Sequence, residues 1–155
     1  MKFLVDRMLG KLAKELRMLG YDTVYYRGED LHQLIQLARK EGRVILTRNT
    51  KLVQQKIDVS ILGVTEDDPT LQLRELIGKG YISSDEEALF IRCLLCNSLL
   101  DEIPREEAEG KVPDFIFYQK KAFFQCPQCR RIYWQGSHLE NMQRKVDELL
   151  PSTKS

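Results

Sequence analysis

The feature that most constrains this chain is a pair of Cys-x-x-Cys motifs. One is Cys93-Leu94-Leu95-Cys96 and the other is Cys126-Pro127-Gln128-Cys129. A two-residue spacing lets two thiolates face one tetrahedral ion from a tight turn, and a second turn of the same kind completes a set of four sulfur ligands. Four protein ligands leave no open position for a substrate. The motifs therefore predict one structural Zn²⁺ in a zinc ribbon.

Two other roles fit the four cysteines less well. A redox Cys-x-x-Cys motif normally opens a helix after a strand and needs no second copy. An iron–sulfur cluster can use four cysteines, but two well-separated pairs are more typical of zinc. Zinc-bound thiolates also persist in a reducing cytosol, where disulfides do not.

The composition is that of a soluble globular protein. Of 155 residues, 43% are hydrophobic and 30% charged, and no apolar run approaches the roughly 20 residues of a membrane-spanning helix. The apolar start of the chain is interrupted early, at Asp6, which argues against a secretory signal, so we expect a cytoplasmic protein. The net charge of +1 indicates nothing about a polyanionic partner.

Residues 1–88 alternate short apolar strands with amphipathic helices. Strands are expected at 3–5, 23–26, 44–47 and 59–64. Helices are expected at 9–19, from Asp30 to Gly42, and from Asp68-Pro69 onward, where a capping carboxylate precedes a first-turn proline. This alternation is typical of a mostly parallel sheet with helices on both faces. Residues 78–87, rich in Gly, Ser and acidic side chains, are interpreted as a linker.

The pattern changes in residues 89–150, which we interpret as the zinc ribbon with a C-terminal helix. Short aromatic strands are expected around the cysteines, at 115–118, 123–124 and 132–134. Ser137 and Glu140 form a capping box that predicts the start of the terminal helix.

Acidic and polar residues follow the expected strands of the first domain. They are Asp6 after the first strand, Glu29 and Asp30 after the second, Arg48 and Asn49 after the third, and Glu66, Asp67 and Asp68 after the fourth. Ligands bind outside the carboxyl ends of parallel strands, and clustered carboxylates can hold a divalent cation that activates water against a phosphodiester. The alternative is structural, because Asp30 and Asp68 also sit at helix starts. Asp22 precedes a strand and is expected at the surface.

Basic residues could hold the phosphates of a nucleic acid without reading its bases. The candidates are Arg7, Lys11, Arg48, Arg130, Arg131 and His138. On the ribbon, cations interleave with aromatics, a pattern that suits single-stranded RNA. The alternative is that most of these aromatics form the core of a small zinc domain.

The chain resembles a known family along nearly its whole length. The residues that carry the resemblance are Phe3-Leu4-Val5-Asp6, Met8 to Ala13, Leu16-Arg17, Leu19 to Asp22, Gly42 to Arg48, Arg92 to Asn97, Cys126 to Cys129 and Tyr133 to His138. They resemble the PIN-like RNase domain named for the C-terminus of the mutator-seven exonuclease proteins. The resemblance implies a PIN-like domain at 1–88, a zinc ribbon at 89–150 and a metal-dependent ribonuclease.

By position, the resemblance matches Asp6 and Asp30 to family acids. At the third position the family usually reads Leu-Thr-Arg-Asp, whereas this chain has Asn49. Asparagine brings no charge and cannot act as a base, although its carbonyl oxygen could reach Mg²⁺ or Mn²⁺. Asp67 or Asp68 could then assist. We also expect the ribbon to flank this acidic edge.

Two functions from different classes follow. One is an Mg²⁺- or Mn²⁺-dependent ribonuclease, and the other is a non-catalytic RNA-binding module. Asn49 is the residue that distinguishes them, because catalysis would have to proceed without the aspartate usual at this position. A phosphoacceptor receiver domain would need an aspartate after the third strand, and Asn49 removes that reading. The sequence does not exclude DNA as the ligand.

Overall fold

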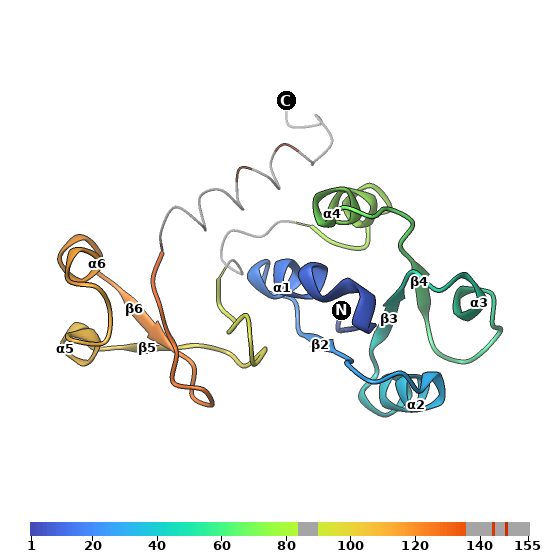
Figure 1. Cartoon of the computed structure of the whole chain (residues 1–155), viewed down its shortest axis with the longest axis horizontal. Helices are drawn as coiled ribbons and strands as arrows, with labels where there is room; N and C mark the ends of the chain where they lie inside the picture. The colour runs from blue at the N-terminus through green and yellow to red at the C-terminus, as the bar shows by residue number, and fades with distance from the viewer. Residues whose placement is uncertain (84–89, 136–143, 145–147, 149–155) are drawn as a thin grey trace.

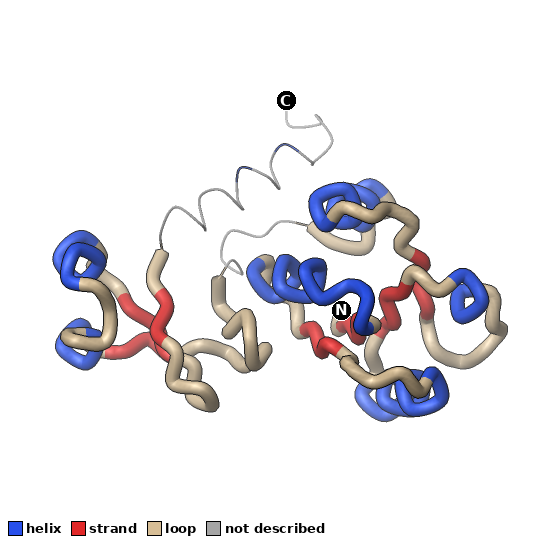
Figure 2. Tube along the Cα trace, viewed as in Figure 1, coloured by secondary structure: helices blue, strands red, loops and turns tan. Residues whose placement is uncertain are grey.

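The computed structural model describes residues 1–83, 90–135, 144 and 148, which form two separate sheets with helices around the first (Figures 1 and 2). The strands of the first sheet are β1 (Phe3–Val5), β2 (Thr23–Tyr25), β3 (Val44–Thr47) and β4 (Ile61–Gly63). Their order is β2-β1-β3-β4, and every pairing is parallel. The expected parallel α/β sheet is confirmed.

Helices cover both faces of this sheet. They are the 3-10 turn η1 (Arg7–Leu9), α1 (Gly10–Met18), α2 (Leu31–Glu41), α3 (Thr50–Val53) and α4 (Pro69–Gly78). Phe3 and Val5 of β1 join α1 and α4 in one core, while Leu4 between them joins α2 and α3 in the other. Successive side chains of a strand point to opposite faces, so one apolar strand supplies both cores. The result is the expected three-layer domain.

The second sheet is antiparallel. It consists of β5 (Asp101–Ile103), β6 (Phe123–Gln125) and β7 (Ile132–Tyr133), with two short helices, α5 (Arg105–Ala108) and α6 (Asp114–Gln119), between β5 and β6. The strands expected at 123–124 and 132–134 are confirmed, each within one residue at its C-terminal end. Most of the ribbon aromatics pack in its small cores, as the structural alternative predicts.

The strand expected at 115–118 is wrong, because these residues form α6. Pro113 precedes the helix, and Ile116 and Phe117 turn inward toward Phe123. Phe115 and Tyr118, three residues apart, are 63% and 77% exposed. This spacing is helical, since residues three apart share one helix face.

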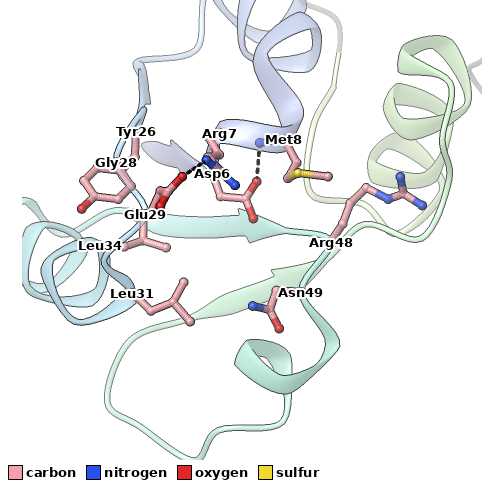
Figure 3. A pocket seen from close by; sticks show the side chains of 10 residues that line it. All are labelled: Asp6, Arg7, Met8, Tyr26, Gly28, Glu29, Leu31, Leu34, Arg48 and Asn49. Atoms are coloured by element: carbon pink, nitrogen blue, oxygen red, sulfur yellow. Dashed lines mark hydrogen bonds and ion pairs between the residues drawn. The ribbon is translucent and has the colours of Figure 1, made fainter.

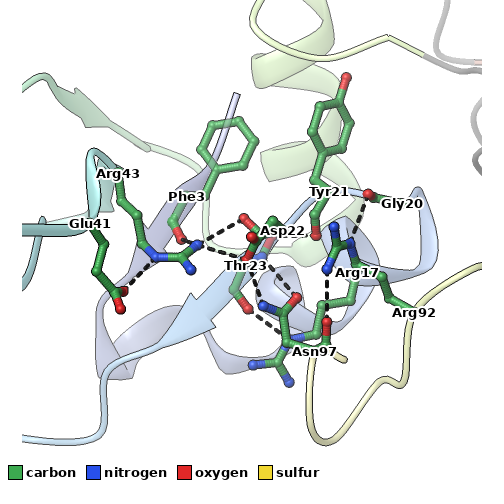
Figure 4. A network of polar contacts seen from close by, with 10 residues as sticks. All are labelled: Phe3, Arg17, Gly20, Tyr21, Asp22, Thr23, Glu41, Arg43, Arg92 and Asn97. Atoms are coloured by element: carbon green, nitrogen blue, oxygen red, sulfur yellow. Dashed lines mark hydrogen bonds and ion pairs between the residues drawn. The ribbon is translucent and has the colours of Figure 1, made fainter. Parts of the chain in front are cut away.

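The two sheets are joined through residues 92–97, here called the first cysteine turn, at the amino-terminal end of the parallel strands (Figure 4). Arg17, 8% exposed, donates to the carbonyl oxygen of Leu94 at 2.6 Å, and Arg92 donates to that of Gly20 at 3.1 Å. Phe90 and Leu94 pack against both the α/β core and the ribbon core. The ribbon therefore contacts the edge opposite the acidic one, and our expectation that it flanks the acidic edge is wrong.

Two further expectations concern the C-terminal part and the membrane. The terminal helix from Ser137 lies outside the described residues, except that Arg144 and Glu148 are helical. Within the described ranges, none of the helices combines the length and apolar character that crossing a membrane requires.

Candidate functional site

A pocket of about 400 Å³ opens at the carboxyl ends of β1 and β3. The strand order reverses between these neighbours, since β2 lies on one side of β1 and β3 on the other. This switch point is where open α/β sheets bind ligands. The lining residues are Asp6, Arg7, Met8, Tyr26, Gly28, Glu29, Leu31, Leu34, Arg48 and Asn49 (Figure 3).

Asp6 is the best-oriented carboxylate of the pocket. It caps η1, and its Oδ1 accepts from the backbone N–H of Met8 at 2.9 Å. Its Oδ2 accepts from the hydroxyl of Thr47, which is fully buried. That hydroxyl in turn accepts from the backbone N–H of Asn49 at 3.0 Å. Asp6 forms no ion pair with any described residue, so its charge is available to a ligand.

Asn49 is held with its amide in one orientation. Its Oδ1 accepts from the backbone N–H groups of Lys51 at 3.0 Å and Leu52 at 3.2 Å, and this caps α3. A backbone N–H cannot donate to the NH₂ group of the amide. The hydrogen bonds from Lys51 and Leu52 therefore fix the amide oxygen toward α3. The carbonyl oxygen suggested by the sequence as a metal ligand is thus already used. Asn49 lines the pocket with a hydrogen-bond donor instead.

Three acids that the sequence predicts to be catalytic, Asp30, Asp67 and Asp68, do not line the pocket. Asp30 caps α2 through the N–H groups of His32 and Gln33, at 2.9 and 3.3 Å. Asp68 caps α4 in the same way, at 2.8 and 3.3 Å. Asp67, an exposed residue, pairs with Arg48. Each acid therefore has a structural role here, as the capping alternative predicts for two of them.

Glu29 lines the pocket where the sequence matched Asp30, one position later. It forms an ion pair with Arg7, and both side chains are largely exposed. The geometry of the loop after β2 determines that Glu29, and not Asp30, lines the pocket. No local signal in the sequence predicts this choice.

The predicted phosphate-binding residues are divided between two ends of the molecule. Arg7 and Arg48 line the pocket, and Lys11 is exposed on α1 outside its lining. Arg130 and Arg131 are exposed in the ribbon, in residues 126–131, here called the second cysteine turn. His138 lies outside the described residues.

The four cysteines come together as the spacing predicts. One sulfur from each lies within 4.8 Å of all the others, and the Sγ atoms of Cys93 and Cys129 are 3.7 Å apart. Tetrahedral zinc with bonds of about 2.3 Å places its sulfur ligands about 3.8 Å apart. Across the described ranges, this is the one group of three or more His, Cys, Asp or Glu side chains placed to share an ion.

Thiols this close do not ionise together without a cation. Burial opposes the thiolate of Cys93, but hydrogen bonds from Tyr133 and from backbone N–H groups outweigh it and lower the pKa of Cys93 to about 7. Hydrogen bonding to Cys129 and burial raise the pKa of Cys96 to about 12. A bound cation would remove this conflict by favouring all four thiolates. The cluster is consistent with a zinc ribbon.

The fold and site define a class: a three-layer α/β domain with a polar pocket at its switch point, joined to a four-cysteine ribbon. Comparison with known families narrows this class. The Mut7-C RNAse domain model matches residues 1–146, and the chain belongs to that family.

Among curated proteins, the chain is similar to the Exonuclease mut-7 homolog of Homo sapiens. The two are 31% identical over 97 residues, which is 59% of this chain and 11% of that relative. The match thus spans only about a tenth of the human protein. No solved structure matches the chain.

Proposed function

We propose that this chain is a metal-dependent ribonuclease whose reaction takes place in the Asp6 pocket. The observation that carries the proposal is the carboxylate of Asp6, oriented by two hydrogen bonds at the switch point and free of any ion pair with a described residue. Family membership supports a nuclease of the RNase type, and the human relative is named an exonuclease.

The pocket suits a hard divalent cation bound together with substrate. Mg²⁺ is commonly held by one or two carboxylates plus substrate phosphates, so Asp6 with a phosphate is an adequate set. Such an ion would activate water and offset the charge on the phosphate. Arg7 and Arg48 would hold flanking phosphates. Their partners Glu29 and Asp67 are exposed, and exposed ion pairs are weak enough to exchange.

The orientation of Asn49 favours a second candidate, an RNA-binding module that does not cut. With Asn49 offering NH₂ rather than a carboxylate, the pocket lacks a second acid on β3. Asp30, Asp67 and Asp68 would have to leave their caps or ion pair to replace it.

An assay of cleavage beside binding separates the two candidates. Purified protein is incubated with structured RNA, single-stranded RNA and matching DNA in Mn²⁺, beside Asn49→Asp. Cleavage of RNA by wild type, raised in Asn49→Asp, supports the nuclease. Binding without cleavage in wild type, with cutting restored in Asn49→Asp, supports the RNA-binding module.

We also propose that the ion in the cysteine cluster is Zn²⁺ with a structural role. The all-sulfur ligand set and the sulfur spacing support zinc over harder cations. Metal analysis of protein purified under reducing conditions tests this assignment. One zinc per chain is expected, and a value near zero contradicts it.

A further inference from the structure

The helix α6, at the end of the ribbon away from the parallel sheet, presents two aromatic side chains to solvent (Figure 1). Phe115 is 63% exposed and Tyr118 is 77% exposed, whereas Ile116 and Phe117 pack against the ribbon core. Aromatic side chains are enriched in protein–protein interfaces, where they bury large apolar areas. This face of α6 therefore has the character of a docking surface.

The neighbouring helix α5 places an acidic flank beside these rings. The acids of residues 97–110 are all exposed, and none forms an ion pair with a described residue; they are Asp101, Glu102, Glu106, Glu107 and Glu109. Arg105, the one basic residue of that stretch, is bound to α6 instead. Its guanidinium lies 4.1 Å from the ring centroid of Phe117 and donates to the carbonyl oxygens of Phe117 and Lys120. These contacts hold the acidic flank against α6.

The rest of the ribbon forms a basic flank. Residues 97–110 hold five acids and one basic residue, and residues 111–135 hold five basic residues and one acid. Lys111 precedes α6 and Lys121 follows it, and both are exposed without an ion pair to any described residue. The aromatic face thus lies between residues of opposite charge balance.

This charge pattern favours one kind of partner. The acidic flank repels a nucleic acid, and the basic flank repels a purely basic protein. A surface that carries both charges is complementary to itself, and a two-fold dimer brings one surface of each subunit against the same surface of the other. We infer that the chain pairs with a second copy of itself through the exposed face of α6. The acidic flank of each copy faces the basic flank of the other. The inference does not depend on the proposed function.

The pairing should be weak, because two rings from each copy cover much less than the roughly 800 Å² per partner of a standard interface. Sedimentation equilibrium of the 155-residue chain, with its metal retained, should show a change from monomer to dimer between about 1 µM and about 1 mM. A wild type that stays monomeric to the top of this range overturns the inference and leaves the face to a different protein.

Substitutions on α6 locate the interface. Phe115→Ala and Tyr118→Ala should each raise the dissociation constant of the dimer by about 20-fold or more, because each removes a contact at two symmetric places. Leu71→Ala is the matched control, since Leu71 is also an exposed apolar residue, 41% exposed, but lies on α4. It should leave the dissociation constant unchanged. Equal values for the three variants would place the interface elsewhere and overturn the inference.

An exchange of charge tests the two flanks. Glu106→Lys with Glu107→Lys makes the acidic flank basic, and Lys111→Glu with Lys121→Glu makes the basic flank acidic. Each double variant alone should be monomeric, because like charges then meet, whereas an equimolar mixture should form mixed dimers. Adding Tyr118→Ala to both should abolish the mixed dimers, which separates docking on α6 from attraction by charge alone. A mixture that fails to associate, or that still associates with Tyr118→Ala, overturns the inference.

Discussion

The backbone N–H of Thr23, which begins the edge strand β2, donates to the Oδ1 of Asn97, 2.9 Å away. Asn97 directly follows Cys96, and its Nδ2 donates to the Oδ1 of Asp22 at 2.7 Å. A residue of the first cysteine turn thus completes the hydrogen bonding of the parallel sheet. At the other end of the same three-residue strand, the hydroxyl of Tyr25 donates to the carbonyl oxygen of Arg7 beside the pocket.

Removing the Asn97 side chain should therefore destabilise the α/β domain and not only the ribbon. Asn97 has φ 66°, so Asn97→Gly removes the contacts without adding backbone strain. The N–H of buried Thr23 loses its acceptor, which costs about 1–3 kcal/mol. Thermal unfolding should shift to lower temperature, and hydrogen exchange at Thr23 should speed up.

The control for this change is Arg130→Gly. Arg130 occupies the equivalent place in the second cysteine turn, with φ 65°, and its N–H donates to the carbonyl oxygen of Cys126 as that of Asn97 does to Cys93. Arg130→Gly should leave exchange at Thr23 unchanged. Equal exchange at Thr23 in the two variants would mean that the ribbon does not support the sheet.

Asp22 should make stability depend on pH in the acid range. Burial opposes its charge, but hydrogen bonds from Asn97 and Arg43 outweigh burial and hold the pKa of Asp22 below its ordinary value. A lowered folded-state pKa stabilises the protein above the unfolded pKa of about 4, and this stabilisation is lost as pH falls through the folded pKa.

Denaturant unfolding of wild type and Asp22→Asn at several pH values measures this contribution. The variant should be less stable by about 1–2 kcal/mol at pH 7, and the difference should shrink below pH 4. Any acid-induced loss of metal from the cysteines should affect both proteins, so the difference between them isolates Asp22. A difference that stays constant down to pH 3 would contradict this assignment.

Tyr133 should tighten the metal site. Its hydroxyl is 3.1 Å from the Sγ of Cys93 and accepts from the N–H of Leu94 at 3.3 Å. Burial and the bond to Cys93 raise the pKa of Tyr133, so the phenol keeps its proton and donates to the sulfur. Tyr133→Phe should weaken zinc binding about 10- to 100-fold, as is usual for groups that support a metal ligand.

Competition with a zinc chelator gives the affinity. Tyr118→Phe is the control, because Tyr118 is 77% exposed and is not among the residues packed around the cysteines. If both phenylalanine variants retain wild-type zinc affinity, Tyr133 has no such role.

Asn49→Asp should change metal-free RNA binding and metal binding in opposite directions. Aspartate caps helices as well as asparagine does, so α3 should persist. The second carboxylate oxygen would replace the NH₂ donor near Asp6, which favours Mn²⁺ and repels phosphate. Calorimetry with Mn²⁺ should give tighter binding, and anisotropy in EDTA should give weaker RNA binding. Unchanged values in both would mean that Asn49 does not face the ligand.

The sequence predicts best those features that depend on residues close together in the chain. The caps at Asp30 and Asp68 and the four-cysteine cluster depend on near neighbours and a known ion geometry, and they are found as predicted. The strand predicted at 115–118 is wrong, because a short run of large apolar residues fits a strand or a helix when its burial is unknown.

Contacts between distant segments lay beyond the sequence. The sequence predicts Asp22 at the surface, but its side chain is only partly exposed and is hydrogen-bonded to Asn97, 75 residues later, and to Arg43. Likewise, the choice of Glu29 over Asp30 in the pocket and the direction of the Asn49 amide are set by backbone geometry in three dimensions. Residue type alone carries no information on either.

The most direct test of the account is the rate of RNA cleavage in Mn²⁺ by wild type, Asp6→Asn and Asp58→Asn. Asparagine at position 6 keeps the cap on η1 but removes the carboxylate charge, whereas Asp58 is an exposed acid whose partner is Arg39. The account predicts that Asp6→Asn lowers the rate by about 100-fold or more and that Asp58→Asn cuts like wild type. Cleavage by Asp6→Asn at the wild-type rate would contradict it.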